Sequence, residues 1–449
     1  MNTHQTILIL EDNEARVALL RQAIEGLGSD YSLKVWPDAP SMRAECEAFF
    51  PTAALISLDH DLNPPPGSKS DPGTGMDIAR FLGDFQPVCP AIVHSQNVER
   101  VWSMYNEMRF AGWVVKQAGG MGIDWSTTAW SKCARELLEK HPNTWRASLS
   151  EDHAARVGRM LLSLDGLGLG DALGEMLSYR FENAARRISQ ADLPPSPWFH
   201  TDDTEMAISI VQVLKSHGEL NQDALARRFA RRFERDPDRG YGSMTRIQLR
   251  EINAGAKWRE MAANAFGGQG SMGNGGAMRV APLGAFFADD LTACVEAARA
   301  SALVTHTHPE GVAGTVAVAV GAAMAWQLRA VAAADFPPQF FGEILRLTPE
   351  SQVRRGILLA SQTPANIPFQ DVAKALGNGS LVTAPDTVPF CFWMAAHHPH
   401  QFAETLGQTI SVGGDCDTNA AIVGGIVALS AGRESIPEAW LKAREPIQI

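Results

Sequence analysis

The sequence predicts a multidomain protein, with a doubly wound parallel α/β domain over residues 1–145 and an all-α domain over residues 146–449. Short apolar runs alternate with helical periodicity up to about residue 118, which is typical of a parallel sheet covered by helices. From residue 150 onward, helical periodicity recurs almost without a strand pattern. The polar stretch at 140–144 is the best candidate linker.

Composition limits the class of function. Hydrophobic residues make up 45% and charged residues 20% of the 449, as in ordinary globular proteins. The net charge of −11 gives no global field that would attract nucleic acid, and the arginines between 227 and 235 are predicted to form a solvated helix face. The apolar run 312–328 is interpreted as a buried helix, so no membrane partner is expected. Six scattered cysteines and an acidic N-terminus without a signal pattern predict a cytoplasmic protein.

Polar side chains follow four apolar runs of the α/β domain. The runs are 7–10, 54–58, 91–93 and 113–115, and the residues that follow them are Glu11, Asp12, Asp59, His60, Asp61, His94, Ser95 and Lys116. Because the carboxyl ends of parallel strands line the binding crevice of such a sheet, these side chains predict a pocket that handles phosphate or metal. The order of Glu11, Asp12, Asp59, Ser95 and Lys116 resembles the receiver domain of response regulators.

Two histidines depart from the ordinary receiver pattern. His60 follows Asp59 in the motif LDHDL, and His94 precedes Ser95 in VHSQN. These motifs are similar to a receiver-like family proposed to process cyclic phosphates. The resemblance implies that His60 and His94 act as acid and base in opening a cyclic phosphodiester. Two alternatives stay open: the imidazoles have only structural roles, or the domain is a regulatory receiver whose Asp59 is phosphorylated or inert.

The all-α domain contains two acidic segments, each at the start of a predicted helix. Thr201-Asp202-Asp203-Thr204 precedes one apolar helical pattern, and Asp415-Cys416-Asp417-Thr418 precedes another. One Asp suffices to cap a helix, so paired carboxylates at both places exceed that need. Brought together they would repel each other without a cation, and hard oxygen ligands favour Mg²⁺, Mn²⁺ or Ca²⁺ over Zn²⁺. The alternative is two independently capped helices.

Further motifs lie between the predicted helices. Asp171 is the polar residue of the small-residue motif GDALG. A glycine-rich loop at 266–279 could place backbone N–H groups around a phosphate or a ribose. The motifs THTHPEG at 305–311, with His306 and His308, and GNG at 377–379 precede helical patterns.

The order GDALG, TDDTEMA, GNGGAMRVAPLG, THTHPEG, GNG and GGDCDTNAAIVGGI resembles the ADP-ribosylglycohydrolases, the family of dinitrogenase-reductase-activating glycohydrolase, over residues 150–435. The resemblance implies an all-α fold, two Mg²⁺ or Mn²⁺ ions, and cleavage of the glycosidic bond between ADP-ribose and an acceptor. The acceptor would be a protein, a nucleic acid or a small molecule.

The resemblance also assigns roles by position. It implies metal ligands at Thr201, Asp202, Asp203, Asp415, Asp417 and Thr418, with Asp202, Asp203 and Asp417 also catalytic. It implies substrate contacts at Asp171, Gly273, Asn274, Gly275, Gly276, Met278 and His308. Where the family places a metal-touching Glu, this chain has Ser178; Glu175 and Glu182 flank it, and Glu182 is predicted to be the catalytic acid. The alternatives are a receiver-gated glycohydrolase and a catalytically silent ADP-ribose-binding module.

Overall fold

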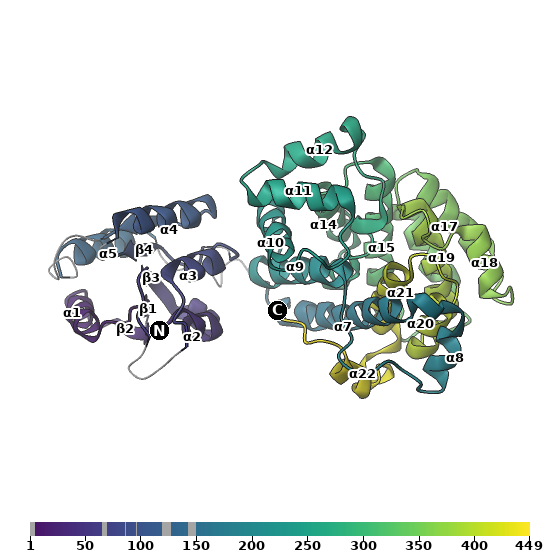
Figure 1. Ribbon diagram of the computed structural model, residues 1–449, viewed down its shortest axis with the longest axis horizontal. Helices are drawn as coiled ribbons and strands as arrows, with labels where there is room; N and C mark the ends of the chain where they lie inside the picture. Colours follow the sequence, from purple (N-terminus) through teal and green to yellow (C-terminus); the bar gives the residue numbers. More distant parts are fainter. Residues whose placement is uncertain (1–4, 65–69, 86, 96, 119–126, 142–149) are drawn as a thin grey trace. The chain divides into compact units, whose positions relative to one another are not determined.

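The computed structural model describes residues 5–64, 70–85, 87–95, 97–118, 127–141 and 150–449 (Figure 1). It divides into two units, one of residues 1–150 with 216–218 and one of residues 151–215 with 219–449. The first is a parallel sheet covered by helices, and the second is helical apart from isolated bridges in the part described. The predicted fold class is confirmed.

The sheet of the first unit has five parallel strands in the order β2-β1-β3-β4-β5. Their bounds are β1 Gln5–Leu10, β2 Tyr31–Trp36, β3 Ala53–Asp59, β4 Ala91–His94 and β5 Val115–Gln117. The central strand β3 is buried along its whole length. Strand β2 lies at the edge and is only partly buried, so its sequence lacks a continuous apolar run and does not predict a strand.

Helices cover both faces of the sheet. They are α1 Glu14–Glu25, α2 Ala39–Glu45, η1 Cys46–Thr52, α3 Gly75–Leu82, α4 Val98–Phe110 and α5 Ala129–Lys140. Leu20 of α1 and Trp130 of α5 belong to one core, whereas Met42 of α2, Ile78 of α3 and Met104 of α4 belong to the other. The sheet is therefore doubly wound. Residues 142–144 of the predicted linker lie outside the described part of the chain.

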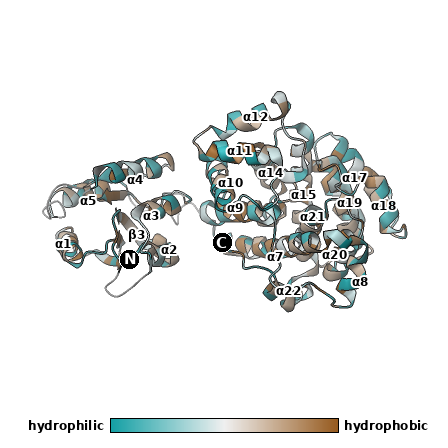
Figure 2. Cartoon of the chain, viewed as in Figure 1, coloured by the Kyte–Doolittle hydropathy of each residue, from teal (hydrophilic) through white to brown (hydrophobic). Residues whose placement is uncertain are grey.

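The second unit consists of helices, whose bounds are α7 His153–Leu177, η3 Ser178–Asn183, α8 Ala184–Ser189, α9 Asp202–His217, α10 Gln222–Arg235, α11 Ser243–Asn253, α12 Trp258–Gly268, η4 Asn274–Gly276, α13 Ala281–Phe286, α14 Leu291–Leu303, α15 Pro309–Gln327, α16 Phe336–Leu347, α17 Gln352–Gln362, α18 Phe369–Leu376, α19 Ala384–His397, α20 Phe402–Ile410, α21 Cys416–Ala431, η5 Arg433–Ser435 and α22 Glu438–Ala443. Peripheral helices such as α18 carry hydrophilic and hydrophobic residues side by side (Figure 2). Helix α18 buries only the apolar residues Val372, Ala373 and Leu376.

Glycines at every fourth position let α7 pack directly against the backbone of α21. A Cβ atom on Gly166 would lie 2.3 Å from the carbonyl oxygen of Gly424, and one on Gly170 would lie 1.9 Å from that of Ala420. At Gly174 the corresponding distance to the Cys416 oxygen is 2.4 Å. Residues four apart share one helix face, so these three glycines form a continuous seam. The seam places the N-terminus of α21 beside the second half of α7.

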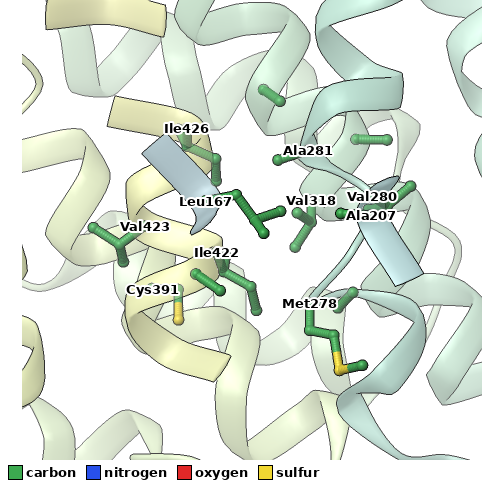
Figure 3. Packing of buried hydrophobic residues seen from close by; sticks show 14 of the residues in the cluster. Leu167, Ala207, Met278, Val280, Ala281, Val318, Cys391, Ile422, Val423 and Ile426 are labelled. Atoms are coloured by element: carbon green, nitrogen blue, oxygen red, sulfur yellow. The ribbon is translucent and has the colours of Figure 1, made fainter. Parts of the chain in front are cut away.

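Helix α15 lies in the core of the second unit. By length and composition it could cross a membrane, but 89% of its apolar window is buried inside the protein, as expected of a core helix. Figure 3 shows Leu167 of α7, Val318 of α15 and Ile422 of α21 gathered in this core. The packed centre holds the ends of α7, α9 and α21 in fixed positions, and these ends carry the acidic motifs.

The arginines of α10 are not all solvated, contrary to the sequence interpretation. Arg228 is 5% exposed and Arg232 is 8% exposed. The Nε of Arg232 donates to Glu205 of α9 at 2.6 Å. The helical pattern placed these cations on one helix, but it could not show that the neighbouring helix supplies an acid. A buried Arg requires such a partner.

Candidate active site

The two acidic segments of the second unit lie together. Asp203 comes from the first turn of α9 and Asp417 from the first turn of α21, and the hydroxyl of Thr418 donates to Asp203 Oδ1 at 3.3 Å. One carboxylate oxygen each from Asp171, Asp203 and Asp417 lie within 4.8 Å of one another. Residues more than 200 positions apart thus form one carboxylate cluster.

Asp171 belongs to the buried side of the cluster and not to the cavity wall. The prediction that it contacts the substrate is therefore wrong. Its side chain is fully buried and does not line the cavity described below. It accepts hydrogen bonds from the backbone N–H and hydroxyl of Thr201, at 3.0 and 2.9 Å, and from those of Thr204, at 3.0 and 2.5 Å. These bonds fix the backbone at the start of α9, and with it the direction of Asp202 and Asp203.

The charges in the cluster repel one another. Burial, followed by the charges of Asp171 and Asp417, raises the pKa of Asp202 and of Asp203 well above the usual value for Asp. Burial and the charge of Asp417 raise the pKa of Asp415 to about 8. The Oδ2 atom of Asp203 is buried and has no hydrogen-bond partner among the described residues. An unpartnered carboxylate oxygen within such a cluster fits a hard divalent cation.

The glycine-rich loop forms the opposite wall of a cavity of about 520 Å³. The Nδ2 of Asn274 donates to Asp415 Oδ2 at 2.7 Å, which ties the loop to the cluster. Gly276 was predicted to contact the substrate, but it does not line the cavity. A Cβ at this position would lie 2.3 Å from the Thr315 hydroxyl oxygen. Of the predicted residues, the lining includes Asp202, Asp203, Gly273, Asn274, Gly275, Met278, His308, Asp415, Asp417 and Thr418.

Two histidines line the cavity, although the sequence singled out only His308. The Nδ1 of His308 accepts the backbone N–H of Glu310 at 3.1 Å, so its ring caps α15. His306 is 4% exposed, and its Nδ1 lies 2.7 Å from the Thr305 hydroxyl. The Pro and Glu that follow His308 could have indicated a capping role from sequence. Nothing in the sequence indicated that His306 faces the glycine-rich loop.

The acids flanking Ser178 differ in position. Glu182, the predicted catalytic acid, is exposed on η3 and does not line the cavity. Glu175, which is also exposed, lies in the last turns of α7, where partial burial and the charge of Asp417 raise its pKa. The structure therefore favours Glu175 over Glu182 as the acid at this edge of the cluster. Counting residues could not distinguish them, because the chain leaves the α-helix at Ser178.

A buried network of charges supports the start of α9 from behind. His200 lies between two acids, with its Nε2 3.1 Å from Glu205 Oε1 and its Nδ1 2.9 Å from Glu445 Oε1. Arg239 pairs with Glu445, and its backbone oxygen accepts the N–H of Asp202 at 2.7 Å. Residues near the C-terminus of the chain thus hold the first metal-ligand candidate of α9 in place.

The first unit has its own acidic pocket at the carboxyl ends of its strands. Oxygens of Glu11, Asp12 and Asp59 lie within 4.8 Å of one another. The guanidinium of Arg16 lies among them, with its Nη2 2.9 Å from both Glu11 and Asp59. Burial raises the pKa of Asp59 to about 6, because it outweighs the nearby cations, and the side chain is only 1% exposed. This pocket is therefore partly neutralised by a residue of the chain itself.

The two histidines of this pocket have different surroundings. The Nδ1 of His60 lies 2.7 Å from Asp61 Oδ1, and Asp61 Oδ2 accepts the hydroxyl of Ser95 at 3.0 Å. His94 is fully buried, with its Nδ1 2.9 Å from the Ser57 hydroxyl and its Nε2 3.4 Å from Glu11. A carboxylate that holds one nitrogen of an imidazole orients the ring, as in catalytic histidine pairs.

Lys116 does not join this pocket, contrary to the sequence prediction. It lies inside β5, where it pairs with Ile92, two residues before His94 at the end of β4. Its ammonium forms an ion pair with Glu136 of α5. The apolar run at 113–115 suggested a strand that ends before Lys116. The actual strand begins later, at Val115, and places Lys116 below the rim of the sheet.

Comparisons with known proteins give relatives for both units. The pattern described as "Cyclic-phosphate processing Receiver domain" matches residues 39–110, and that described as "ADP-ribosylglycohydrolase" matches residues 152–448. The ADP-ribosylhydrolase ARH3 of Mus musculus is 29% identical over 338 residues, which cover 65% of this chain and 89% of that protein.

Two further relatives cover the same region. An uncharacterized protein of Archaeoglobus fulgidus is 31% identical over 290 residues, covering 62% of this chain and 88% of that one. A solved ADP-ribosylglycohydrolase-related protein complex has 24% identity and a TM-score of 0.47, covering 65% of this chain and 93% of that one. Both resemblances drawn from the motifs are confirmed. The matched family pattern spans well over half of the sequence, and the chain belongs to the ADP-ribosylglycohydrolase family.

Proposed function

We propose that the second unit is a metal-dependent hydrolase that releases ADP-ribose from an acceptor. The observation that carries this proposal is the cavity between the carboxylate cluster and the glycine-rich loop. The loop offers backbone N–H groups to a diphosphate, while the cluster faces the same space with acids suited to ribose hydroxyls and a cation. The ARH3 proteins to which this chain is similar are named for ADP-ribosyl hydrolysis.

The donor set supports two Mg²⁺ or Mn²⁺ ions. Thr201, Asp202 and Asp203 would hold them at the start of α9, and Asp415, Asp417 and Thr418 would hold them at the start of α21. Repulsion among these carboxylates and the unpartnered oxygen of Asp203 favour a cation at this position. When bound, such ions lower the pKa of a coordinated water and fix the hydroxyls of a sugar.

The residues of the chain account for the remaining chemistry. Water adds to the anomeric carbon of the ribose, the bond from that carbon to the acceptor breaks, and one carboxylate of the cluster takes the proton of the water. The carboxyl group then passes this proton to the acceptor as it leaves, and ADP-ribose retains the new hydroxyl. Positive charge develops on the ribose in the transition state, and the nearby carboxylates stabilise it.

Release of ADP-ribose from modified protein, RNA and small-molecule substrates tests the proposal. Each substrate is assayed with Mg²⁺, with Mn²⁺ and with EDTA, using wild type and Asp203→Asn. We expect release that requires metal and is lost in the variant. Asp335→Asn, an exposed acid outside the cluster whose side chain does not cap its helix, is the control and should leave the rate unchanged. Binding of ADP-ribose without release from any substrate would contradict hydrolysis and indicate a binding module.

For the first unit we propose that His60 assists the opening of a cyclic phosphodiester on a related substrate. The contact between His60 and Asp61 supports this role, because the carboxylate orients the ring and leaves Nε2 to exchange a proton with the substrate or with water. The burial of His94 and its contacts with Ser57 and Glu11 favour a supporting role for that ring.

A receiver that gates the hydrolase is the alternative, and two variants distinguish the functions. Cyclic phosphates of nucleotides and of ADP-ribose are incubated with His60→Gln and with Asp59→Asn. Phosphodiester opening that is lost with His60→Gln supports catalysis. If neither variant affects any cyclic phosphate and Asp59→Asn changes the rate of ADP-ribose release, the first unit regulates the second.

A further inference from the structure

The imidazole of His306 lies with one edge against the glycine-rich loop. A Cβ on Gly275 would lie 3.0 Å from its Nε2, and one on Gly273 would lie 3.4 Å from the same atom. Glycine at both positions therefore lets the loop approach the ring. Since His306 also lines the cavity, its Nε2 faces the space in which the loop would hold a ligand.

The other nitrogen of this ring ends a chain of hydrogen bonds that begins at Arg279. The Nη2 of Arg279 lies 2.8 Å from the hydroxyl oxygen of Thr305, and that oxygen lies 2.7 Å from Nδ1 of His306. A guanidinium can only donate hydrogen bonds, so Thr305 accepts from Arg279. The Thr305 oxygen has a second lone pair, but among the described residues no other group accepts its proton, so that proton is directed to Nδ1 of His306.

Arg279 is firmly held in the position that this chain requires. It is fully buried, with its guanidinium 4.5 Å from the centre of the Phe229 ring and its Nη2 3.1 Å from the Ser301 carbonyl oxygen. A buried cation costs free energy unless it is compensated, and core packing alone does not require one here. Its contact with Thr305 gives the charge a defined role beside the cavity.

We propose that Arg279 and Thr305 are positioning residues that fix His306 in its neutral tautomer with the proton on Nε2. His306 then presents one permanent N–H donor to an oxygen of the ligand held by the glycine-rich loop. The identity of that ligand, the phosphate and ribose part of ADP-ribose, rests on the proposed function. The assignment of the tautomer rests on the hydrogen bonds and not on the identity of the ligand.

The protonated form of the ring does not compete with this tautomer near neutral pH. Burial, together with the charge of Arg279, lowers the pKa of His306 to about 3. A doubly protonated ring would also place an N–H at Nδ1 against the Thr305 hydroxyl, which would then have to stop donating. The buried surroundings and the hydrogen-bond chain thus favour the same state.

Two measurements on the full-length protein test the proposal. Long-range proton–nitrogen spectra of the histidine-labelled protein identify which ring nitrogen carries the proton, and the His306→Gln spectrum assigns the signals. Calorimetry with ADP-ribose then compares wild type, Thr305→Val and Thr305→Ser. We expect the Nε2 proton in wild type and in Thr305→Ser, and a mixture of tautomers in Thr305→Val. Thr305→Val should bind ADP-ribose roughly five- to tenfold more weakly, because one fixed donor is lost, and Thr305→Ser should restore the affinity.

The outcomes separate this proposal from the proposed function. A proton on Nδ1 in wild type would overturn it, as would a Thr305→Val protein with an unchanged tautomer. If wild type binds no ADP-ribose, the proposed function fails, while the spectra still decide the role of Arg279 and Thr305. An unchanged stabilisation of Thr305→Val by Mg²⁺ would show that a weaker affinity does not come from a damaged carboxylate cluster.

Discussion

Replacing Gly170 by alanine tests whether the contact between α7 and α21 builds the carboxylate cluster. The new Cβ would lie 1.9 Å from the carbonyl oxygen of Ala420 and 2.4 Å from its carbonyl carbon, whereas ordinary contact begins at 3.4 Å. Both atoms belong to helix backbones, so no side chain can rotate away. The two helices must separate locally by about 1.5 Å to relieve the overlap.

The expected cost follows from this displacement. Overpacking a close helix contact costs about 3 kcal/mol, which lowers the Tm of a unit of this size by roughly 5 °C. Asp171 is the next residue, and Asp417 lies at the start of the other helix, so the same movement widens the cluster. Gly170→Ala should therefore also lose most of the stabilisation that Mg²⁺ gives to the wild-type protein.

Thermal unfolding with and without Mg²⁺ measures both effects, and Gly158→Ala is the matched control. Gly158 lies on an exposed face of the same helix, and a Cβ there meets nothing within 4 Å. Since alanine is the better helix former, this control should gain about 0.5–1 kcal/mol. The reasoning is refuted if Gly170→Ala melts at the same temperature as Gly158→Ala and keeps its full response to Mg²⁺.

Three further predictions concern the same unit. Asp417→Asn should abolish both metal-dependent release of ADP-ribose and the Mg²⁺ shift in Tm while the far-UV circular dichroism spectrum stays native; a retained shift would contradict its role as a ligand. Glu445→Gln should weaken Mg²⁺ binding by about 10- to 100-fold in a titration, because it loosens the support of α9 behind the ligands; an equal affinity with a lower Tm would indicate a purely structural role. Burial opposes ionisation of Glu205, but bonds from His200 and the charge of Arg232 outweigh it and lower its pKa to about 2. Its contribution to stability is therefore complete above about pH 4.5 and is lost as the pH falls toward 2, and acid unfolding of Glu205→Gln should show a correspondingly weaker pH dependence.

Much of the fold and part of the site follow from local sequence patterns. The acidic segments at the start of α9 and α21 predict two helix N-termini, because an acidic side chain stabilises the free N–H groups of the first helical turn. The fully buried strand β3 is equally evident, since its residues form an uninterrupted apolar run. These features depend on residues that are close in the sequence, so they can be predicted without a structure.

What the sequence could not predict depends on contacts between distant segments. Asp171 resembles a ligand contact in its motif, yet both of its oxygens are occupied by Thr201 and Thr204. The register of β5 decides whether Lys116 reaches the pocket, and a shift of two residues removes it. His306 and His308 are the same residue type in one short motif, so the sequence does not distinguish their roles. Their hydrogen-bond partners do, because His308 caps α15 whereas His306 is held by Thr305 beside the cavity.

The seam between α7 and α21 also has a consequence for synthesis of the protein. Its two helices lie near opposite ends of the sequence of the second unit, so α7 leaves the ribosome long before α21 is synthesised. Until α21 follows, the glycine face of α7 and the apolar surface of α15 remain uncovered in the nascent chain. Contacts of such high sequence separation form late, and uncovered apolar helices are prone to aggregate. We expect released chains that stop before residue 416 to need a chaperone, and released chains that extend past residue 431 to become resistant to protease.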